Sequence, residues 1–88
     1  MTETAYWLDG NALAGLLVEV FGTEMTAVVR ECQSCGARNA VGAHRAYPGP
    51  SPVLRCPACG DLALRITTVA ERHVIQIAGT WMMDLPRR

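Results

Sequence analysis

The sequence predicts a small α+β domain stabilised by a metal ion, in which one N-terminal helix precedes a set of antiparallel strands. Three observations support this fold class. A chain of 88 residues buries only a small apolar core, so an additional crosslink is expected to hold it together. Four cysteines stand in two closely spaced pairs. Apolar residues recur with the period of a helix near the N-terminus and with the period of strands after it.

The apolar pattern of the helix starts beside an acidic residue and stops at a glycine. Asp9 suits the N-cap position, and Leu8 and Leu13 would form a hydrophobic staple around it. Gly22 suits the position after the last helical turn, so the helix is expected at residues 10–21. Its apolar stripe has helical spacing and consists of Leu13, Leu16, Leu17, Val20 and Phe21.

After Gly22 the apolar period changes to two, which predicts strands. Six short strands are expected, at about residues 25–30, 40–47, 53–55, 62–67, 73–78 and 80–85. The proline-rich stretch 48–52 forms a stiff turn between two of them. A second turn is expected at residues 70–72, and Gly79 separates the last two strands.

The composition is that of a folded protein without net charge. Half of the residues are hydrophobic and 18% are charged, which excludes a disordered chain. Eight arginines balance eight acids, and lysine is absent. Neutrality argues against a bulk electrostatic binder of nucleic acid or of anionic membranes. Without lysine the chain can form neither a Schiff base nor the phosphate-binding P-loop.

The cysteines carry the chemistry that the sequence predicts. Cys32, Cys35, Cys56 and Cys59 form the pattern C-x2-C-x20-C-x2-C, which is a spacing of zinc sites. A glycine follows the second cysteine of each pair, so the backbone can take the positive φ of a tight turn whose amides point at the sulfurs. Pro57 stiffens the second turn. Two such turns can close a tetrahedral site of four thiolates around one Zn²⁺.

Other interpretations of the cysteines agree less well with the sequence. Disulfides need an oxidising compartment, and the N-terminus has neither the charged nor the apolar region of a secretory signal. A thioredoxin-like C-x-x-C opens a helix, whereas strand patterns follow both pairs here. The longest uncharged stretch, from His73 to Met83, has eleven residues and is too short to span a bilayer. We therefore expect a cytoplasmic protein that does not enter a membrane.

The two cysteine turns, residues 32–36 (Cys-Gln-Ser-Cys-Gly) and 56–60 (Cys-Pro-Ala-Cys-Gly), resemble the knuckles of the zinc ribbon family. With the segment 8–15 (Leu-Asp-Gly-Asn-Ala-Leu-Ala-Gly), the chain resembles over nearly its whole length a small uncharacterised bacterial zinc-ribbon family of unknown function. This resemblance implies a zinc-binding fold, brings no activity with it, and suggests an accessory role to a redox enzyme. Rubredoxins share both knuckles and hold iron, so iron is the alternative metal.

The resemblance and the patterns together predict a single domain that comprises residues 1–88. Its expected parts are a tail at 1–7, an amphipathic helix at 8–22, and a zinc ribbon with a C-terminal hairpin at 23–88. A closed site of four cysteines leaves no coordination position for a substrate, and no nucleophile with a neighbouring base stands out. The sequence therefore predicts a protein that is not an enzyme.

Neither histidine is expected to bind the metal, because the four cysteines already fill the site. His44 lies in a strand pattern beside an arginine and is expected on a solvated face, and His73 is likewise placed outside the site. This leaves the four cysteines as the complete set of predicted metal ligands.

The expected function is that of an adaptor or accessory subunit that binds a protein partner or a second copy of itself. The candidate contact surfaces are the apolar helix and the segment Trp81-Met82-Met83. An iron-based electron carrier is the second hypothesis, and a nucleic-acid-binding ribbon is the third. The third would use six arginines, which otherwise form a solvated sheet face with salt bridges: Arg30, Arg38, Arg45, Arg55, Arg65 and Arg72.

Overall fold

The computed structural model describes residues 7–87, so the predicted tail at 1–7 lies outside the described residues except for Trp7. The helix predicted at residues 10–21 is confirmed and has two parts. A 3-10 turn, η1 (Gly10–Leu13), leads directly into the α-helix α1 (Ala14–Phe21). No helical segment among residues 7–87 is long and apolar enough to cross a membrane.

Both ends of this helical segment are capped as the sequence predicts. The carboxylate of Asp9 accepts a hydrogen bond of 3.1 Å from the backbone N–H of Asn11. At the other end Gly22 adopts a left-handed conformation, and its N–H donates to the carbonyl of Val18 at 2.7 Å. These two caps fix where the helix begins and ends.

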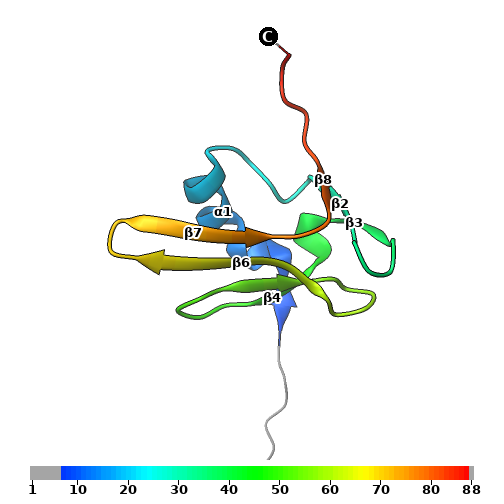
Figure 1. The fold of residues 1–88 in the computed structure, drawn as a ribbon, viewed down its shortest axis with the longest axis horizontal. Coiled ribbons are helices and arrows are strands. Elements are labelled where there is room, and N and C mark those ends of the chain that lie inside the picture. Colours follow the sequence, from blue (N-terminus) through cyan, green and yellow to red (C-terminus); the bar gives the residue numbers. More distant parts are fainter. Residues whose placement is uncertain (1–6, 88) are drawn as a thin grey trace, which may run out of the picture.

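The strands form two antiparallel sheets (Figure 1). Residues 7–87 contain the strands β1 (Leu8–Asp9), β2 (Val29–Glu31), β3 (Arg38–Ala40), β4 (Arg45–Tyr47), β5 (Val53–Arg55), β6 (Leu62–Val69), β7 (Arg72–Ile77) and β8 (Thr80–Met82). The larger sheet has the order β1-β4-β5-β6-β7, and the smaller sheet has the order β3-β2-β8. The long β6–β7 hairpin, yellow to orange in Figure 1, projects from the body of the molecule.

Three expectations about the first half of the chain are wrong in detail. The strand predicted at 25–30 is reduced to β2, because Val28 N–H closes a turn onto Met25 O at 3.0 Å. The strand predicted at 40–47 is split into β3 and β4 by the 3-10 turn η2 (Val41–Ala43). Leu8, predicted in a hydrophobic staple, belongs instead to β1, which pairs with β4. The first difference comes from a local turn. The other two come from contacts distant in sequence, because η2 donates hydrogen bonds to Val28 O and Thr26 O and β1 pairs with β4.

The second half of the chain agrees more closely with the sequence. The strands predicted at 53–55, 62–67 and 73–78 correspond to β5, β6 and β7. The last predicted strand ends early, because β8 stops at Met82. The hairpin nearest the C-terminus is formed by β6 and β7, while β8 pairs with β2 in the other sheet.

Gly79 is where the chain passes from the larger sheet to the smaller one. Its φ is 86°, and a Cβ atom added there would lie 2.6 Å from the carbonyl oxygen of Glu31 and 2.9 Å from Nε of Arg30. No other residue fits this combination of conformation and close contact. The tight crossing brings β8 alongside β2, next to the first cysteine pair.

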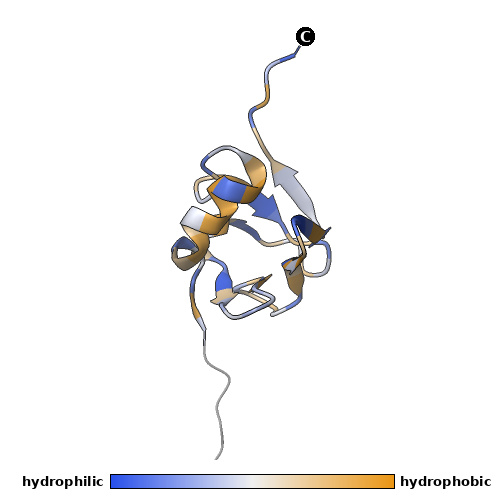
Figure 2. Ribbon diagram, turned by 90° about the vertical axis from the view of Figure 1, so that its left-hand side faces the viewer, coloured by the Kyte–Doolittle hydropathy of each residue, from blue (hydrophilic) through white to orange (hydrophobic). Residues whose placement is uncertain are grey.

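The apolar core lies between α1 and the strands, which occupy opposite sides of the molecule in Figure 2. Two residues of the predicted apolar stripe, Leu13 and Leu17, are buried in this core. The remaining buried apolar residues come from the loop before β2, from η2 and from the larger sheet: Met25, Val41, Ala46, Leu54, Ala63, Leu64 and Ile66. This core holds the larger sheet to the helix and leaves the cysteines at its border.

The turn of the β6–β7 hairpin provides a stability test. Ala70 has a φ of 56°, the one positive φ of a non-glycine residue among the described positions. Glycine takes this conformation without strain. Ala70→Gly should therefore stabilise the protein by about 1 kcal/mol, measured as an increased midpoint of denaturant unfolding. Glu71→Gly, in the same two-residue turn, is the control and should be neutral or destabilising. Equal effects of the two variants would contradict this account.

Candidate metal centre

The two cysteine pairs lie on turns of the same construction. In the first, Cys32 N–H donates to Ala37 O at 2.9 Å and Gly36 N–H donates to Cys32 O at 3.0 Å. In the second, Cys56 N–H donates to Asp61 O and Gly60 N–H donates to Cys56 O, both at 2.9 Å. The φ angles of the two glycines, 75° and 83°, agree with the positive φ that the sequence predicts there. Local sequence therefore determines the shape of each knuckle.

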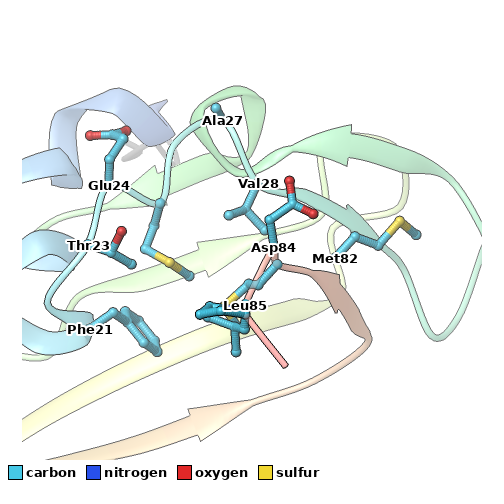
Figure 3. Close-up of a pocket in the computed structure, with 11 residues that line it drawn as sticks. Phe21, Thr23, Glu24, Ala27, Val28, Met82, Asp84 and Leu85 are labelled. Atoms are coloured by element: carbon cyan, nitrogen blue, oxygen red, sulfur yellow. The ribbon is translucent and has the colours of Figure 1, made fainter. Parts of the chain in front are cut away.

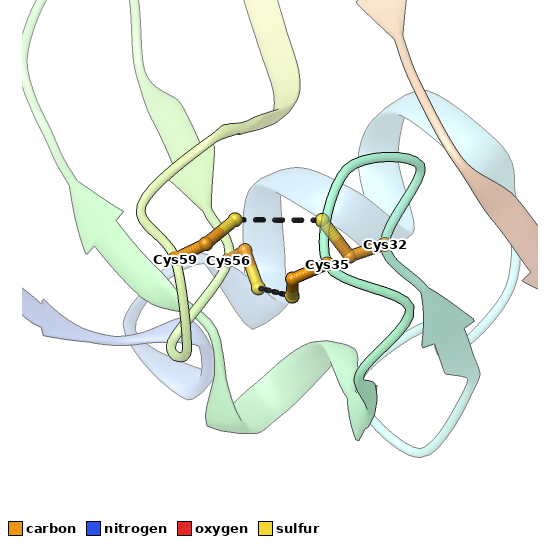
Figure 4. Close-up of side chains that lie close together, drawn as sticks. All are labelled: Cys32, Cys35, Cys56 and Cys59. Atoms are coloured by element: carbon orange, nitrogen blue, oxygen red, sulfur yellow. Dashed lines mark hydrogen bonds between the residues drawn. The ribbon is translucent and has the colours of Figure 1, made fainter.

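The two knuckles come from different sheets. The first, residues 32–36, connects β2 to β3 in the smaller sheet, and the second, residues 56–60, connects β5 to β6 in the larger one. Figure 4 shows the knuckles facing each other with their sulfur atoms in between. A group bound by all four sulfurs would therefore join the two sheets.

The sulfur atoms have the spacing that a tetrahedral metal ion requires. All four lie within 4.8 Å of one another. Two separations between the knuckles are 3.6 Å, from Cys32 to Cys59, and 3.7 Å, from Cys35 to Cys56. Metal–sulfur bonds of about 2.3 Å in a tetrahedron place sulfurs about 3.8 Å apart, whereas a disulfide needs about 2.05 Å. The donor set and its spacing thus fit one ion that accepts four thiolates.

Backbone amides prepare some of the sulfurs to carry negative charge. The N–H groups of Ser34, Ala58 and Asp61 donate to the sulfurs of Cys32, Cys56 and Cys59, each at 3.4 Å. These donors are the amides that the tight turns were expected to direct at the sulfurs. Hydrogen bonds of this kind stabilise thiolates in preference to thiols.

The cysteines nevertheless do not all ionise on their own. Backbone N–H donation, from Cys35 first and Ser34 second, lowers the pKa of Cys32 to about 6. The N–H of Asp61 is the largest influence on Cys59 and lowers its pKa, but burial and the three neighbouring thiols outweigh it and raise the value to about 12. A bound dication would supply the positive charge that four adjacent thiolates need.

Side chains tie the two knuckles together beside the sulfurs. Gln33 Nε2, from the first knuckle, donates to Asp61 Oδ2 at 3.0 Å and to Leu62 O at 3.2 Å. Ser34 Oγ also donates to the carboxylate of Asp61. The hydrogen bond from Ser34 is the first cause that lowers the pKa of Asp61. The knuckles are therefore in direct polar contact as well as sharing a sulfur cluster.

Two of the predicted surface arginines hold the second knuckle. Arg45 Nη2 donates to Pro57 O at 3.0 Å, and Arg55 Nη1 donates to Gly60 O at 3.1 Å. The guanidinium carbon of Arg45 also lies 4.6 Å from the ring centroid of Trp7. These arginines therefore fix the backbone of the metal-binding turn.

Arg30 was expected on a solvated or nucleic-acid-binding face, and this expectation is wrong. Arg30 is only 1% exposed. Nε donates to Ala78 O at 2.9 Å, and Nη2 donates to Leu62 O at 3.3 Å and to the side-chain oxygen of Gln33. A sequence signal was present, because a strand period of two places Arg30 on the same face as Cys32. The side chain of Arg30 thus connects β2 by hydrogen bonds to β6 of the larger sheet and to Gln33 of the first knuckle.

The histidines lie outside the sulfur cluster, and His44 is buried, against expectation. It is 1% exposed, its Nδ1 donates to Ala40 O at 2.9 Å, and its Nε2 accepts from Arg30 at 3.2 Å. This pattern requires the neutral imidazole. His73 lies on the β6–β7 hairpin, with Nε2 at 3.4 Å from a carboxylate oxygen of Glu19. In the described part of the chain the metal-binding group consists of the four cysteines.

The fold and the site define a small α+β domain with a four-cysteine cluster held by two ribbon-like knuckles. A family model described as "Family of unknown function (DUF6510)" matches residues 2–88, and the chain belongs to that family. Neither a curated protein nor a solved structure matches this chain. The family assignment agrees with the resemblance to an uncharacterised family and leaves the function to be inferred from the site.

His44 makes the stability of the fold depend on pH. Burial is the first cause that lowers its pKa below the usual 6.5, and the charge of Arg30 lowers it further. The unfolded chain therefore binds a proton that the folded chain does not. The stabilising contribution is complete above about pH 6.5 and is lost as the pH falls below it, by at most about 1.4 kcal/mol per pH unit.

The measurement compares the free energy of unfolding of the wild type with that of His44→Gln between pH 5 and 7.5. Glutamine can donate to Ala40 O and accept from Arg30 but does not titrate. The wild type should lose stability more steeply on acidification than His44→Gln does. Metal release at low pH affects both proteins alike, so parallel pH curves would show that His44 is not the titrating group.

Proposed function

We propose that this protein is a non-catalytic zinc-binding ribbon protein that acts as an adaptor or accessory subunit through protein–protein contacts. The observation that carries the proposal is the donor set: four cysteine sulfurs lie within 4.8 Å of one another, which are enough donors to fill every position of a tetrahedral ion. Such a zinc ion has no open position for water or substrate, so its role is structural. Zn²⁺ has no redox chemistry of its own, which leaves binding as the function of the domain.

Exposed apolar side chains support a role in protein binding. Leu85 is 70% exposed, and Val69, Val74 and Ile77 on the β6–β7 hairpin are 53%, 48% and 45% exposed. Val69 and Val74 lie on the same face of the hairpin, and exposed apolar side chains that share a face are typical of partner surfaces. A protein partner or a second copy of the chain would cover them, and a redox enzyme is the class of partner that the family resemblance favours.

The positions of the arginines favour a protein partner over nucleic acid. Arg45 and Arg55 donate to carbonyls of the second knuckle, and Arg30 is buried. Arg38 pairs with Glu31 at 3.0 Å. Guanidinium groups engaged in this way are less able to contact phosphates, which supply most of the affinity in nucleic-acid binding.

Iron at the same four cysteines is the second candidate, which would make the protein a one-electron carrier. The favouring observation is that Cys35 and Cys59 are exposed while Cys32 and Cys56 are buried. One edge of the cluster therefore faces the solvent, where a redox partner could approach. Iron and zinc both accept four thiolates in a tetrahedron, so metal analysis is needed to choose between them.

The test is elemental analysis of protein purified without added metal, reported as moles of each metal per chain. The proposal predicts one zinc per chain and a colourless protein. Cys35→Ser should lose the metal and its cooperative unfolding transition. His73→Gln, which changes a possible ligand outside the cluster, should keep one zinc per chain.

One iron per chain, with a visible chromophore and reversible reduction, would contradict the zinc adaptor and establish the electron carrier. The metal content of protein overexpressed in excess iron is not sufficient, because four-thiolate sites accept both metals. The analysis is therefore made on protein from cells grown without metal supplements.

A separate measurement tests the nucleic-acid hypothesis, in which binding to an oligonucleotide is measured at two salt concentrations. Steep loss of oligonucleotide binding with salt would instead indicate nucleic-acid recognition.

A further inference from the structure

A groove of about 570 Å³ lies between the C-terminal end of α1 and the segment that follows β8 (Figure 3). One wall is formed by the end of α1 and the loop before β2, and the other by the chain from Met82 onward. Its size is within the range of sites that hold small molecules or a few side chains.

The lining is mainly apolar and rich in methionine. Met25 is fully buried at the groove, Met83 is partly buried, and Met82 is 38% exposed. Three of the four methionines in the chain thus line one groove. In Figure 3, Phe21 and Leu85 face each other from opposite walls. Flexible methionine side chains adapt to partners of different shape, so this surface suits an apolar side chain of another molecule.

The charged residues of the lining are both acids. Glu24 belongs to the wall before β2, Asp84 belongs to the opposite wall, and both are exposed. The carboxylate of Glu24 is held in place by the backbone N–H of Thr26 at 2.8 Å and by its hydroxyl group. The rim therefore presents negative charge on two sides of an apolar floor.

We propose that this groove binds a segment of a partner protein in which a large apolar side chain stands between lysine or arginine residues. The apolar side chain would enter between Phe21, Met25 and Leu85, and the basic residues would pair with Glu24 and Asp84. Charge complementarity favours a basic segment, because the lining has a carboxylate on each wall and no basic side chain. The inference rests on the proposed adaptor function and names the chemistry of its partner.

The experiment uses a display library of random heptapeptides, panned against the metal-loaded full-length chain. Enriched peptides are then synthesised, labelled and titrated by fluorescence anisotropy against matched variants. Asp84→Arg changes the charge at the rim, and Glu71→Arg makes the same change in the exposed turn of the β6–β7 hairpin. Leu85→Ser removes an exposed apolar side chain of the groove, and Leu8→Ser removes one from β1, which does not line the groove.

The expected result is enrichment of peptides with a large apolar residue next to lysine or arginine. Their affinity should fall at least tenfold for Asp84→Arg and for Leu85→Ser, and should change less than twofold for Glu71→Arg and Leu8→Ser. Higher salt should weaken the binding moderately, because two exposed carboxylates take part.

Three other results would overturn the inference in distinguishable ways. Enriched peptides that lack basic residues, or that bind Asp84→Arg as well as Glu71→Arg, would move the contact to another surface and leave the adaptor function standing. A dimer in solution that dissociates in Leu85→Ser would show that a second copy fills the groove. If no peptide is enriched over the blank support although the chain is folded and metal-loaded, the groove does not bind such a segment, and the adaptor function then rests on the exposed apolar side chains of the β6–β7 hairpin alone.

Discussion

The junction of the two knuckles is the contact on which the rest of the structure depends. The smaller sheet consists of three strands of three residues each, which is too little to be stable alone. It meets the larger sheet where Cys32 and Cys35 face Cys56 and Cys59. Four adjacent sulfurs repel one another as thiolates, and a dication converts this repulsion into attraction. The same ion would therefore balance charge and join the sheets.

The positions of three arginines follow from the charge and the backbone carbonyls at this junction. An ion with four thiolates carries a net charge of about −2 for a dication. Three guanidinium groups donate hydrogen bonds to carbonyls at this junction. Those of Arg45 and Arg55 bond to carbonyls of the second knuckle, and that of Arg30 bonds to the carbonyl of Leu62, next to it. They satisfy backbone acceptors and also supply positive charge near the cluster. Three of the six arginines between residues 30 and 72 are thus engaged at the junction of the two knuckles.

Local patterns in the sequence predict those parts of the fold that local interactions determine. The helix at 10–21, the long strand β6 and both knuckles follow from spacing, caps and glycine positions. The division of 40–47 by η2 and the burial of Arg30 and His44 depend on contacts between distant segments. An arginine and a histidine that satisfy each other in the interior look, in the sequence, like two solvated polar residues. The groove was not predicted, because the sequence indicated the helix and the segment 81–83 only as separate candidate surfaces and could not show that Phe21, Met82 and Met83 line the same groove.

Amide hydrogen exchange, followed by NMR before and after removal of the metal with a strong chelator, tests the central claim most directly. If the ion at the four cysteines holds the two sheets together, its removal should abolish the protection of amides in β2 and β3 and sharply reduce that in β5 and β6. Restoring the metal should restore both. Protection that persists unchanged in the smaller sheet after the metal has left would show that hydrogen bonds and the apolar core are sufficient, and would contradict the account.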